Sequence, residues 1–181
     1  MNSLNGPLWD AARAGNGSAI RSLLEEGVDV NCRDLEGRTA LPIACYEGHI
    51  DVATLLLDCG ANINNVDSRG MTALTVACMN GKLEIARLLL ERGHDVHQKN
   101  NKGDSALHWA CKLGYTELAL LLVYKGADMG MRNYLNKSPL DLAASEEMRG
   151  AMLNLKDQMR GIVKDPPVKK KGKEPYMYII P

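Results

Sequence analysis

The sequence contains no phenylalanine, and aromatic residues make up only 4% of its 181 residues. Its apolar 45% is mainly Leu, Ala, Val, Ile and Met, which suits short, closely packed helices better than an aromatic core. There is also no excess of charge, because 22 Lys and Arg balance 22 Asp and Glu. Binding along a nucleic acid needs a concentrated basic face, so we expect no nucleic-acid partner.

Long apolar runs and targeting segments are absent as well. The longest apolar run, Leu118 to Tyr124, is far shorter than a membrane span, so we expect no membrane association. The N-terminal residues lack the basic and apolar regions of a secretory signal, which favours a cytoplasmic protein with reduced thiols. Signatures of phosphate loops, hydrolase elbows and zinc proteases are also missing. We therefore expect no enzyme activity and no cofactor.

Cysteine and histidine are the remaining candidates for disulfide or metal chemistry. Cys45, Cys78 and Cys111 are spaced by 33 residues, which places them on successive packed helices about 8–10 Å apart. A disulfide needs Cα atoms within about 7 Å, so we predict buried free thiols. His94 and His97 form a pair without a third ligand nearby in the sequence, and we expect no metal site.

What the sequence does contain is a 33-residue repeat. Three glycine columns follow this interval: Gly37, Gly70 and Gly103; Gly15, Gly48, Gly81 and Gly114; and Gly27, Gly60, Gly93 and Gly126. Apolar columns keep the same step: Leu8, Leu41, Leu74, Leu107 and Leu140; Ala11, Ala44, Ala77, Ala110 and Ala143; and Leu23, Leu56, Leu89 and Leu122. A single period in so many columns indicates a repeat architecture.

Each unit predicts two short helices. The first begins at a hydroxyl residue that can cap its free N–H groups, namely Thr39, Thr72, Ser105 or Ser138. The second carries an i, i+3, i+4 apolar stripe, as in Val52, Leu55 and Leu56. Helices of about eight to ten residues are too short to be stable alone, so neighbouring units must stack.

These residues resemble the ankyrin repeat, which has a 33-residue period and a Thr-Pro-Leu-His-x-Ala signature. The matching stretches are Gly37-Arg38-Thr39-Ala40-Leu41-Pro42-Ile43-Ala44, Gly70-Met71-Thr72-Ala73-Leu74-Thr75-Val76-Ala77, Gly103-Asp104-Ser105-Ala106-Leu107-His108-Trp109-Ala110 and Lys137-Ser138-Pro139-Leu140-Asp141-Leu142-Ala143. The resemblance implies an all-α solenoid of about five helix-turn-helix repeats joined by β-hairpin fingers. It also implies a non-catalytic protein-protein interaction module, such as an adaptor, inhibitor or assembly chaperone, and we expect a monomer.

The period divides the chain into an N-terminal capping repeat (5–33), three repeats (34–66, 67–99 and 100–132), a C-terminal capping repeat (133–156) and a basic, flexible tail (157–181). Pro42 and Thr75 replace the signature histidine, so only His108 is expected to bond a finger. In the last unit Asn136 and Glu147 fill glycine columns, and the last helix is expected to run on through Met159.

The resemblance places partner binding on a concave face made by the fingertips and the first helices. The columns that vary there are the predicted contacts: Arg13, Tyr46, Glu47, Met79, Asn80, Lys112, Leu113, Arg38, Arg69, Met71, Lys102 and Asp104. Tyr46, Met79 and Leu113 are expected to form an exposed apolar stripe with a charged rim. The alternative is that these are ordinary solvent-facing side chains. Trp9 and Trp109 are predicted to be packing residues.

Two further functional hypotheses concern other parts of the chain. The column of Asn31, Asn64 and His97 resembles the position that an asparaginyl hydroxylase modifies in ankyrin proteins, which would make the protein a regulated substrate. In the tail, Lys169, Lys170, Lys171 and Lys173 form a candidate nuclear localisation run or a solvated linker. The apolar segment from Pro175 to Pro181 either docks on the solenoid or carries a recognition motif, with the repeats as a passive scaffold.

Overall fold

A computed structural model describes residues 5–164, and side chains are described for residues 6–160. The helices are α1 (Asn5–Ala14), α2 (Gly17–Glu25), α3 (Ala40–Glu47), α4 (Ile50–Asp58), α5 (Ala73–Met79), α6 (Leu83–Glu91), α7 (Ala106–Leu113), α8 (Thr116–Tyr124), the 3-10 turn η1 (Leu140–Leu142) and α9 (Glu146–Lys164). The described part of the chain contains no regular strand, so the all-helical prediction is confirmed. The predicted nuclear run, Lys169 to Lys173, lies outside the described residues.

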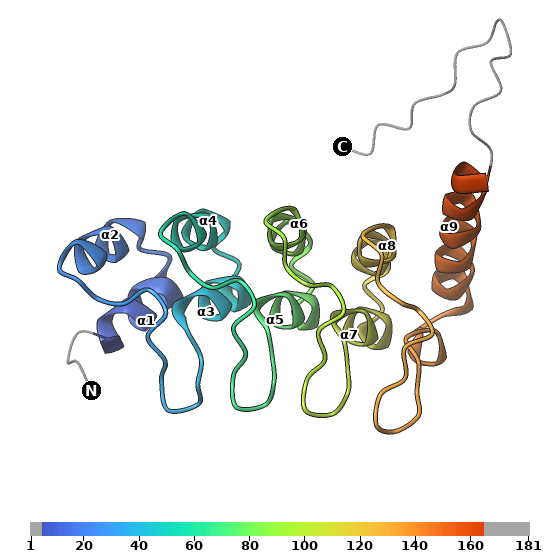
Figure 1. The fold of residues 1–181 in the computed structure, drawn as a ribbon, viewed down its shortest axis with the longest axis horizontal. Coiled ribbons are helices and arrows are strands. Elements are labelled where there is room, and N and C mark those ends of the chain that lie inside the picture. Colours follow the sequence, from blue (N-terminus) through green and yellow to red (C-terminus); the bar gives the residue numbers. More distant parts are fainter. Residues whose placement is uncertain (1–4, 165–181) are drawn as a thin grey trace, which may run out of the picture.

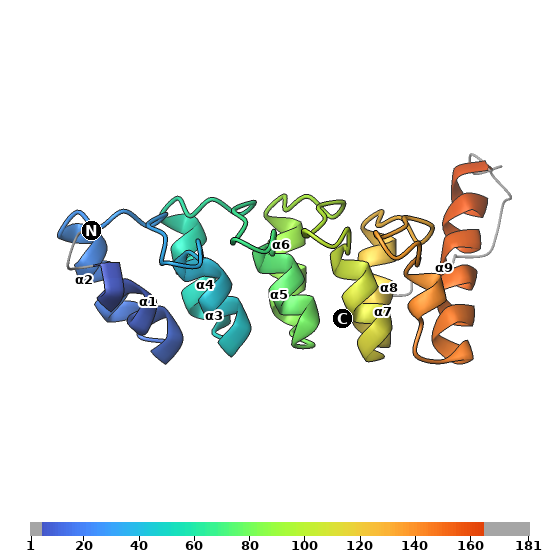
Figure 2. The same cartoon turned by 90° about the horizontal axis from the view of Figure 1, so that it is seen from below.

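The helices form two layers along a solenoid (Figures 1 and 2). The first helices, α1, α3, α5 and α7, lie beside one another, and the second helices, α2, α4, α6 and α8, form the layer above them in Figure 1. Long loops project from the first-helix layer on the side away from the second helices. This arrangement leaves one face of the first helices bordered by the loops.

The core consists of the repeated apolar columns. Leu56, Leu89 and Leu122 are fully buried between the layers, and burying each leucine contributes about 1.5–3 kcal/mol. The cysteine column, Cys45, Cys78 and Cys111, is also buried and its thiols are free, as predicted. Burial raises the pKa of both Cys45 and Cys111 to about 12, so these thiols remain protonated and unreactive.

Glycine is favoured between the two helices of a unit, for one conformational and one steric reason. Gly48 has a φ of 97°, which side chains with a Cβ rarely adopt. A Cβ there would also lie 3.0 Å from Nζ of Lys82 in the next repeat. That ammonium donates to the carbonyl of Glu47 at 3.3 Å. The turn therefore provides a contact by which one repeat stacks on the next.

The projecting loops were predicted to be β-hairpin fingers, and the structure shows no regular strands in them. Strand pairing is reduced to one isolated antiparallel bridge between Lys99 and Ser105 within the described residues. A side-chain oxygen instead organises each loop: in the second, Oδ1 of Asp67 accepts from the amides of Arg69 and Met71 at 2.9 and 2.8 Å. Asp34, Asn100 and Asn133 do the same in the other loops. These side-chain bonds satisfy amides that would otherwise need a partner strand.

The hydroxyl at the start of a first helix can cap it only where the residue three positions later has a backbone N–H to donate. Oγ1 of Thr72 accepts from the amide of Thr75 at 3.1 Å, as predicted. The equivalent bond from Thr39 is missing. Its partner would be residue 42, which is proline and has no N–H. The hydroxyl of Thr39 is left buried without a hydrogen-bond partner, so the capping prediction is wrong at this position.

The C-terminal unit differs most from the others. Its first helix is only the 3-10 turn η1, whereas its second helix, α9, has 19 residues. Asn136 adopts the left-handed conformation with a φ of 58° in place of a glycine, while Glu147 lies within α9 and does not end it. The predicted flexible tail from residue 157 is corrected in part, since α9 continues to Lys164.

Candidate functional site

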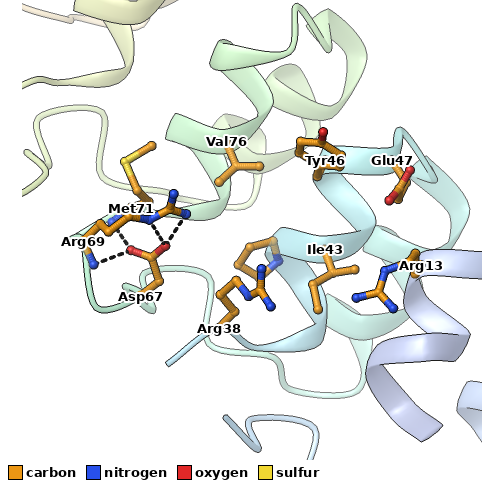
Figure 3. Close-up of a pocket in the computed structure, with 10 residues that line it drawn as sticks. Arg13, Arg38, Ile43, Tyr46, Glu47, Asp67, Arg69, Met71 and Val76 are labelled. Carbon is orange, nitrogen blue, oxygen red and sulfur yellow. Dashed lines mark hydrogen bonds and ion pairs between the residues drawn. The ribbon is translucent and has the colours of Figure 1, made fainter. Parts of the chain in front are cut away.

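Three consecutive units enclose a hollow of about 350 Å³ between the loops and the first helices (Figure 3). Arg13 reaches it from α1, Tyr46 and Glu47 from α3, and Arg69 from the second loop. The full lining is Arg13, Arg38, Pro42, Ile43, Tyr46, Glu47, Asp67, Arg69, Met71 and Val76. Six of the twelve predicted contact residues are therefore brought together here.

The floor of the hollow is apolar and is formed by α3, α5 and the end of the second loop. Ile43 and Met71 are 8% and 5% exposed, and Val76 is half-buried. Pro42 is buried beside them in the first turn of α3. Because these side chains also pack in the interior, the floor is preformed and needs no rearrangement to receive an apolar group.

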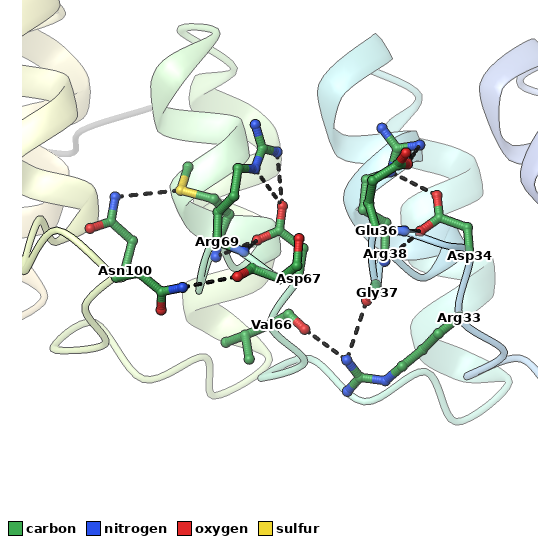
Figure 4. Close-up of polar contacts among 12 residues, drawn as sticks. Arg33, Asp34, Glu36, Gly37, Arg38, Val66, Asp67, Arg69 and Asn100 are labelled. Carbon is green, nitrogen blue, oxygen red and sulfur yellow. Dashed lines mark hydrogen bonds and ion pairs between the residues drawn. The ribbon is translucent and has the colours of Figure 1, made fainter.

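Arginines form the rim, and carboxylates of the same chain hold them in place (Figure 4). Nε of Arg38 donates to Oδ2 of Asp34 at 2.7 Å. The guanidinium of Arg69 donates twice to Oδ2 of Asp67, at 3.0 and 2.8 Å, and 70% of the Arg69 side chain remains exposed. Arg13 pairs with an aspartate of its own helix. The rim therefore presents oriented guanidinium groups that still have unused N–H donors.

The charge of the rim is stable over the ordinary pH range. Burial alone would raise the pKa of the Asp67 carboxyl, but bonds from the Met71 and Arg69 amides and the Arg69 guanidinium outweigh it, so that pKa lies below its usual value. The hydrogen bond to Asp34 raises the pKa of the Arg38 guanidinium. The Asp67 carboxylate and the Arg38 guanidinium consequently stay ionised at neutral and mildly acidic pH.

The predicted apolar stripe is exposed only in part. Tyr46 and Leu113 are 55% and 43% exposed, whereas Met79 is half-buried. Nδ2 of Asn80 donates to the Val76 carbonyl at 2.8 Å, so this amide caps α5. Met71 was predicted at an exposed fingertip, but it is only 5% exposed and its side chain lies at the floor of the hollow.

The other predicted contacts lie outside the hollow, farther along the same row of helices and loops. Lys102 and Lys112 are exposed, and Nζ of Lys112 lies 5.3 Å from the centre of the Trp109 ring. Asp104 is half-buried, and its Oδ1 accepts from Nδ2 of Asn133 at 2.7 Å. Trp109 is half-buried beneath Lys112 on this surface, whereas Trp9 packs against the core as predicted.

Sequence reasoning missed the floor residues Pro42, Ile43 and Val76. At the start of a helix such residues look like core. A signal was present, because Ile43 and Val76 share a 33-residue column with Asp10 and Trp109. Core columns keep one residue type from repeat to repeat, whereas this one changes in size and polarity, as surface columns do.

The candidate hydroxylation column connects consecutive turns. Asn31 accepts from the Asn62 amide at 2.7 Å and donates to the Gly60 carbonyl at 3.1 Å. Asn64 accepts from the amide of Asp95 at 3.2 Å in the next repeat. His97 is exposed at the end of this series. Both asparagines thus have a structural role that explains their recurrence.

His108 and His94 both make contacts within the repeat scaffold. His108 bonds the next loop as predicted, with Nε2 3.2 Å from the Lys137 carbonyl, while Nδ1 accepts from the Ser105 amide at 3.0 Å. His94 is buried in the turn after α6.

Among residues 5–164, no three His, Cys, Asp or Glu side chains are placed to hold a metal ion. No helix in that range is long and apolar enough to cross a membrane.

Comparison with known proteins agrees with the geometry. A family profile described as "Ankyrin repeats (3 copies)" matches residues 8–100, 60–133 and 92–159. The chain is similar to Ankyrin repeat domain-containing protein 29 of Homo sapiens, at 52% identity over 48 residues, covering 26% of this chain and 16% of that protein. It is 44% identical over 54 residues to Osteoclast-stimulating factor 1 of Gallus gallus, covering 30% and 27% of the two chains.

A third similar protein is named Probable E3 ubiquitin-protein ligase XBOS33, from Oryza sativa subsp. japonica. It is 45% identical over 56 residues, which covers 31% of this chain and 11% of that protein. The chain thus covers at most 27% of these three relatives. The matches concern the repeats alone.

Proposed function

Because the chain belongs to the ankyrin-repeat family, we propose that it is a non-catalytic interaction module that binds a partner protein at the hollow between its loops and first helices. The observation that carries the proposal is the combination of a preformed apolar floor with an arginine rim. Ankyrin-repeat proteins generally act by binding other proteins, and stacked repeats offer extended surfaces for this purpose.

The residue types at the hollow are those that dominate protein interfaces. Tyrosine and arginine are enriched among the residues whose truncation costs most binding energy. Tyr46 offers a large, half-exposed ring beside Ile43 and Val76. Arg38 and Arg69 are already held by carboxylates, so less side-chain entropy is lost when a partner binds.

The shape of the surface favours a protein over a small molecule. The hollow is open, and beyond it the same row of first helices continues through α5 and α7 to Lys112 and Leu113, which are both exposed. Four first helices packed about 8–10 Å apart give a strip on the order of 25–30 Å long. A strip of this length accommodates a peptide segment or one edge of a folded domain.

The test compares two exposed tyrosines by affinity purification from a native lysate. Tyr46 is 55% exposed at the hollow, and Tyr124 is 58% exposed at the end of α8 in the other layer. We expect Tyr46→Ala, alone and with Arg69→Ala, to lose the partners that the unaltered chain recovers, while Tyr124→Ala keeps them. Circular dichroism melting would verify that all variants are folded. If Tyr46→Ala/Arg69→Ala recovers the same partners in equal amounts, the hollow is not the binding site.

A role as a hydroxylation substrate is the second proposal, and it centres on Asn64. This residue is exposed and makes a single side-chain bond of 3.2 Å, whereas Asn31 is held on both sides by the next turn. Mass spectrometry of the protein isolated from its cells would detect an added oxygen. Unmodified Asn64 in most molecules would remove support for this role.

A further inference from the structure

The C-terminal helix is much longer than the helix it covers. α9 has 19 residues and α8 has 9, and at 1.5 Å per residue the difference is about 15 Å. Figure 1 shows the C-terminal end of α9 extending past α8, on the side away from the loops. The last turns of α9 therefore have no helix of comparable length beside them.

The apolar stripe of α9 becomes less covered along its length. Met148 and Met152 are 1% and 0% exposed against the solenoid. Leu155 and Met159 continue the same stripe and are only half-buried. The apolar face therefore continues beyond the part of α9 that the solenoid fully covers.

A second hollow, of about 600 Å³, lies where this coverage ends. The end of α8 and the turn after it contribute Val123, Ala127 and Met129, and α9 contributes Lys156, Met159 and Arg160. Earlier in the solenoid each second helix packs against the next one, as α4 does with α6 and α6 with α8. At α8 the last such position is filled by α9 alone. This leaves an apolar groove bordered by two basic residues, Lys156 and Arg160, and one acidic residue, Asp128.

We propose that residues 175–180 of the same chain, Pro175-Tyr176-Met177-Tyr178-Ile179-Ile180, occupy this groove. They form the strongly apolar segment of the chain beyond α9, and they match the groove in chemistry. Glu174 directly precedes them and complements Lys156 and Arg160 at the groove edge.

The length of the connecting chain permits this contact. Tyr176 is twelve positions after Lys164, where α9 ends, and twelve steps of extended chain span up to about 40 Å. The groove residues Lys156 and Arg160 lie only about 6–12 Å back along the helix axis. Pro166 and Pro167 disfavour continuation of the helix, which lets the chain reverse.

The docked segment has consequences that are separate from partner binding at the first hollow. It shields the exposed part of Met159, and it closes residues 165–174, with the basic run 169–173, into a loop at the C-terminal end of the solenoid. The first hollow involves α1, α3 and α5, at the other end. Each site can therefore be present without the other.

Thiol labelling on the full chain tests the proposal. In a Cys59→Ser background, which removes the exposed native thiol, Lys156→Cys places a thiol in the groove. Asn154→Cys is the control, since residue 154 is exposed and lies about 200° around the helix from residue 156. The rate of maleimide labelling is measured with the native segment and with Ile179→Asp/Ile180→Asp.

We expect the double aspartate substitution to accelerate labelling at position 156 roughly tenfold, which corresponds to a segment docked in about 90% of molecules. Labelling at position 154 should not change. Equal rates at position 156 with and without the aspartates would overturn the proposal. If the protection at 156 increases with protein concentration, the segment binds a second copy instead, and docking within one chain is likewise refuted.

Discussion

Acidification is expected to destabilise the fold through His94, a buried imidazole in the turn after α6. Its side chain is 6% exposed, and Nδ1 lies 2.9 Å from the carbonyl of Asp95. If Nδ1 carries the proton and donates to that carbonyl, Nε2 is the atom that must take up a second one. Nε2 is buried without a hydrogen-bond partner. Desolvation by burial therefore lowers the pKa of His94 from 6.5 to about 4, against a smaller opposing effect of Asp95.

The size and sign of the effect follow from this pKa. Between pH 6.5 and pH 4 the unfolded chain binds a proton at His94 and the folded chain does not, so the free energy of unfolding falls as the pH is lowered. With an unfolded pKa of 6.5 and a folded pKa of about 4, the loss is about 2 kcal/mol at pH 5 and approaches about 3 kcal/mol below pH 4. The contribution of His94 is fully present above pH 6.5.

Urea unfolding at pH 7.5 and pH 5.0 measures this loss in the unaltered chain and in His94→Ala. Alanine is the natural choice because Ala61 and Ala127 occupy the same column. The variant should lose about 2 kcal/mol less than the unaltered chain on acidification. His97→Ala, at an exposed neighbour, should lose as much as the unaltered chain. Other titrating groups, including His108, are shared and cancel in the comparison. Equal losses in His94→Ala and the unaltered chain would refute the burial argument.

Two more predictions concern thiol reactivity and helix capping. In the native protein, a thiol reagent should modify Cys59 rapidly and the other four cysteines only on unfolding, because they are buried; more than one fast thiol in a stopped-flow titration would contradict this. Thr72→Val should lower the free energy of unfolding by about 1–2 kcal/mol, since it removes the cap to Thr75. Thr39→Val should be neutral or stabilising, because Pro42 offers its hydroxyl no N–H. Similar losses in the two variants, measured by urea unfolding, would show that the capping bond is not the cause.

The repeated scaffold could be predicted from the sequence because it depends on local spacing. A leucine column at a 33-residue period predicts buried positions such as Leu56 and Leu89, and both are fully buried. The bond from His108 to the following loop was also predictable, since the signature histidine survives in one repeat only. In each case the prediction depends on one column of the repeat, and the residue that is contacted lies in the neighbouring repeat.

The candidate site was predicted less completely, because it depends on how three units are placed together. The variable columns pointed to Arg13, Tyr46 and Arg69, which do line the hollow. They also pointed to Met71 as an exposed contact, yet its side chain is buried at the floor of the hollow. The residue types in the column of Met71 do not determine on which side of the loop its side chain lies.

The sequence by itself determined the period, the helix pairs, the buried columns and the family. These follow from hydrophobic spacing and from residues, such as Gly48, that few others can replace. Only the tertiary structure decided that Arg38 forms an ion pair with Asp34, that the floor and rim meet in one hollow, and that α9 extends beyond α8. The physical reason is that spacing specifies contacts between adjacent turns and repeats, whereas a surface depends on distances among side chains from several repeats at once.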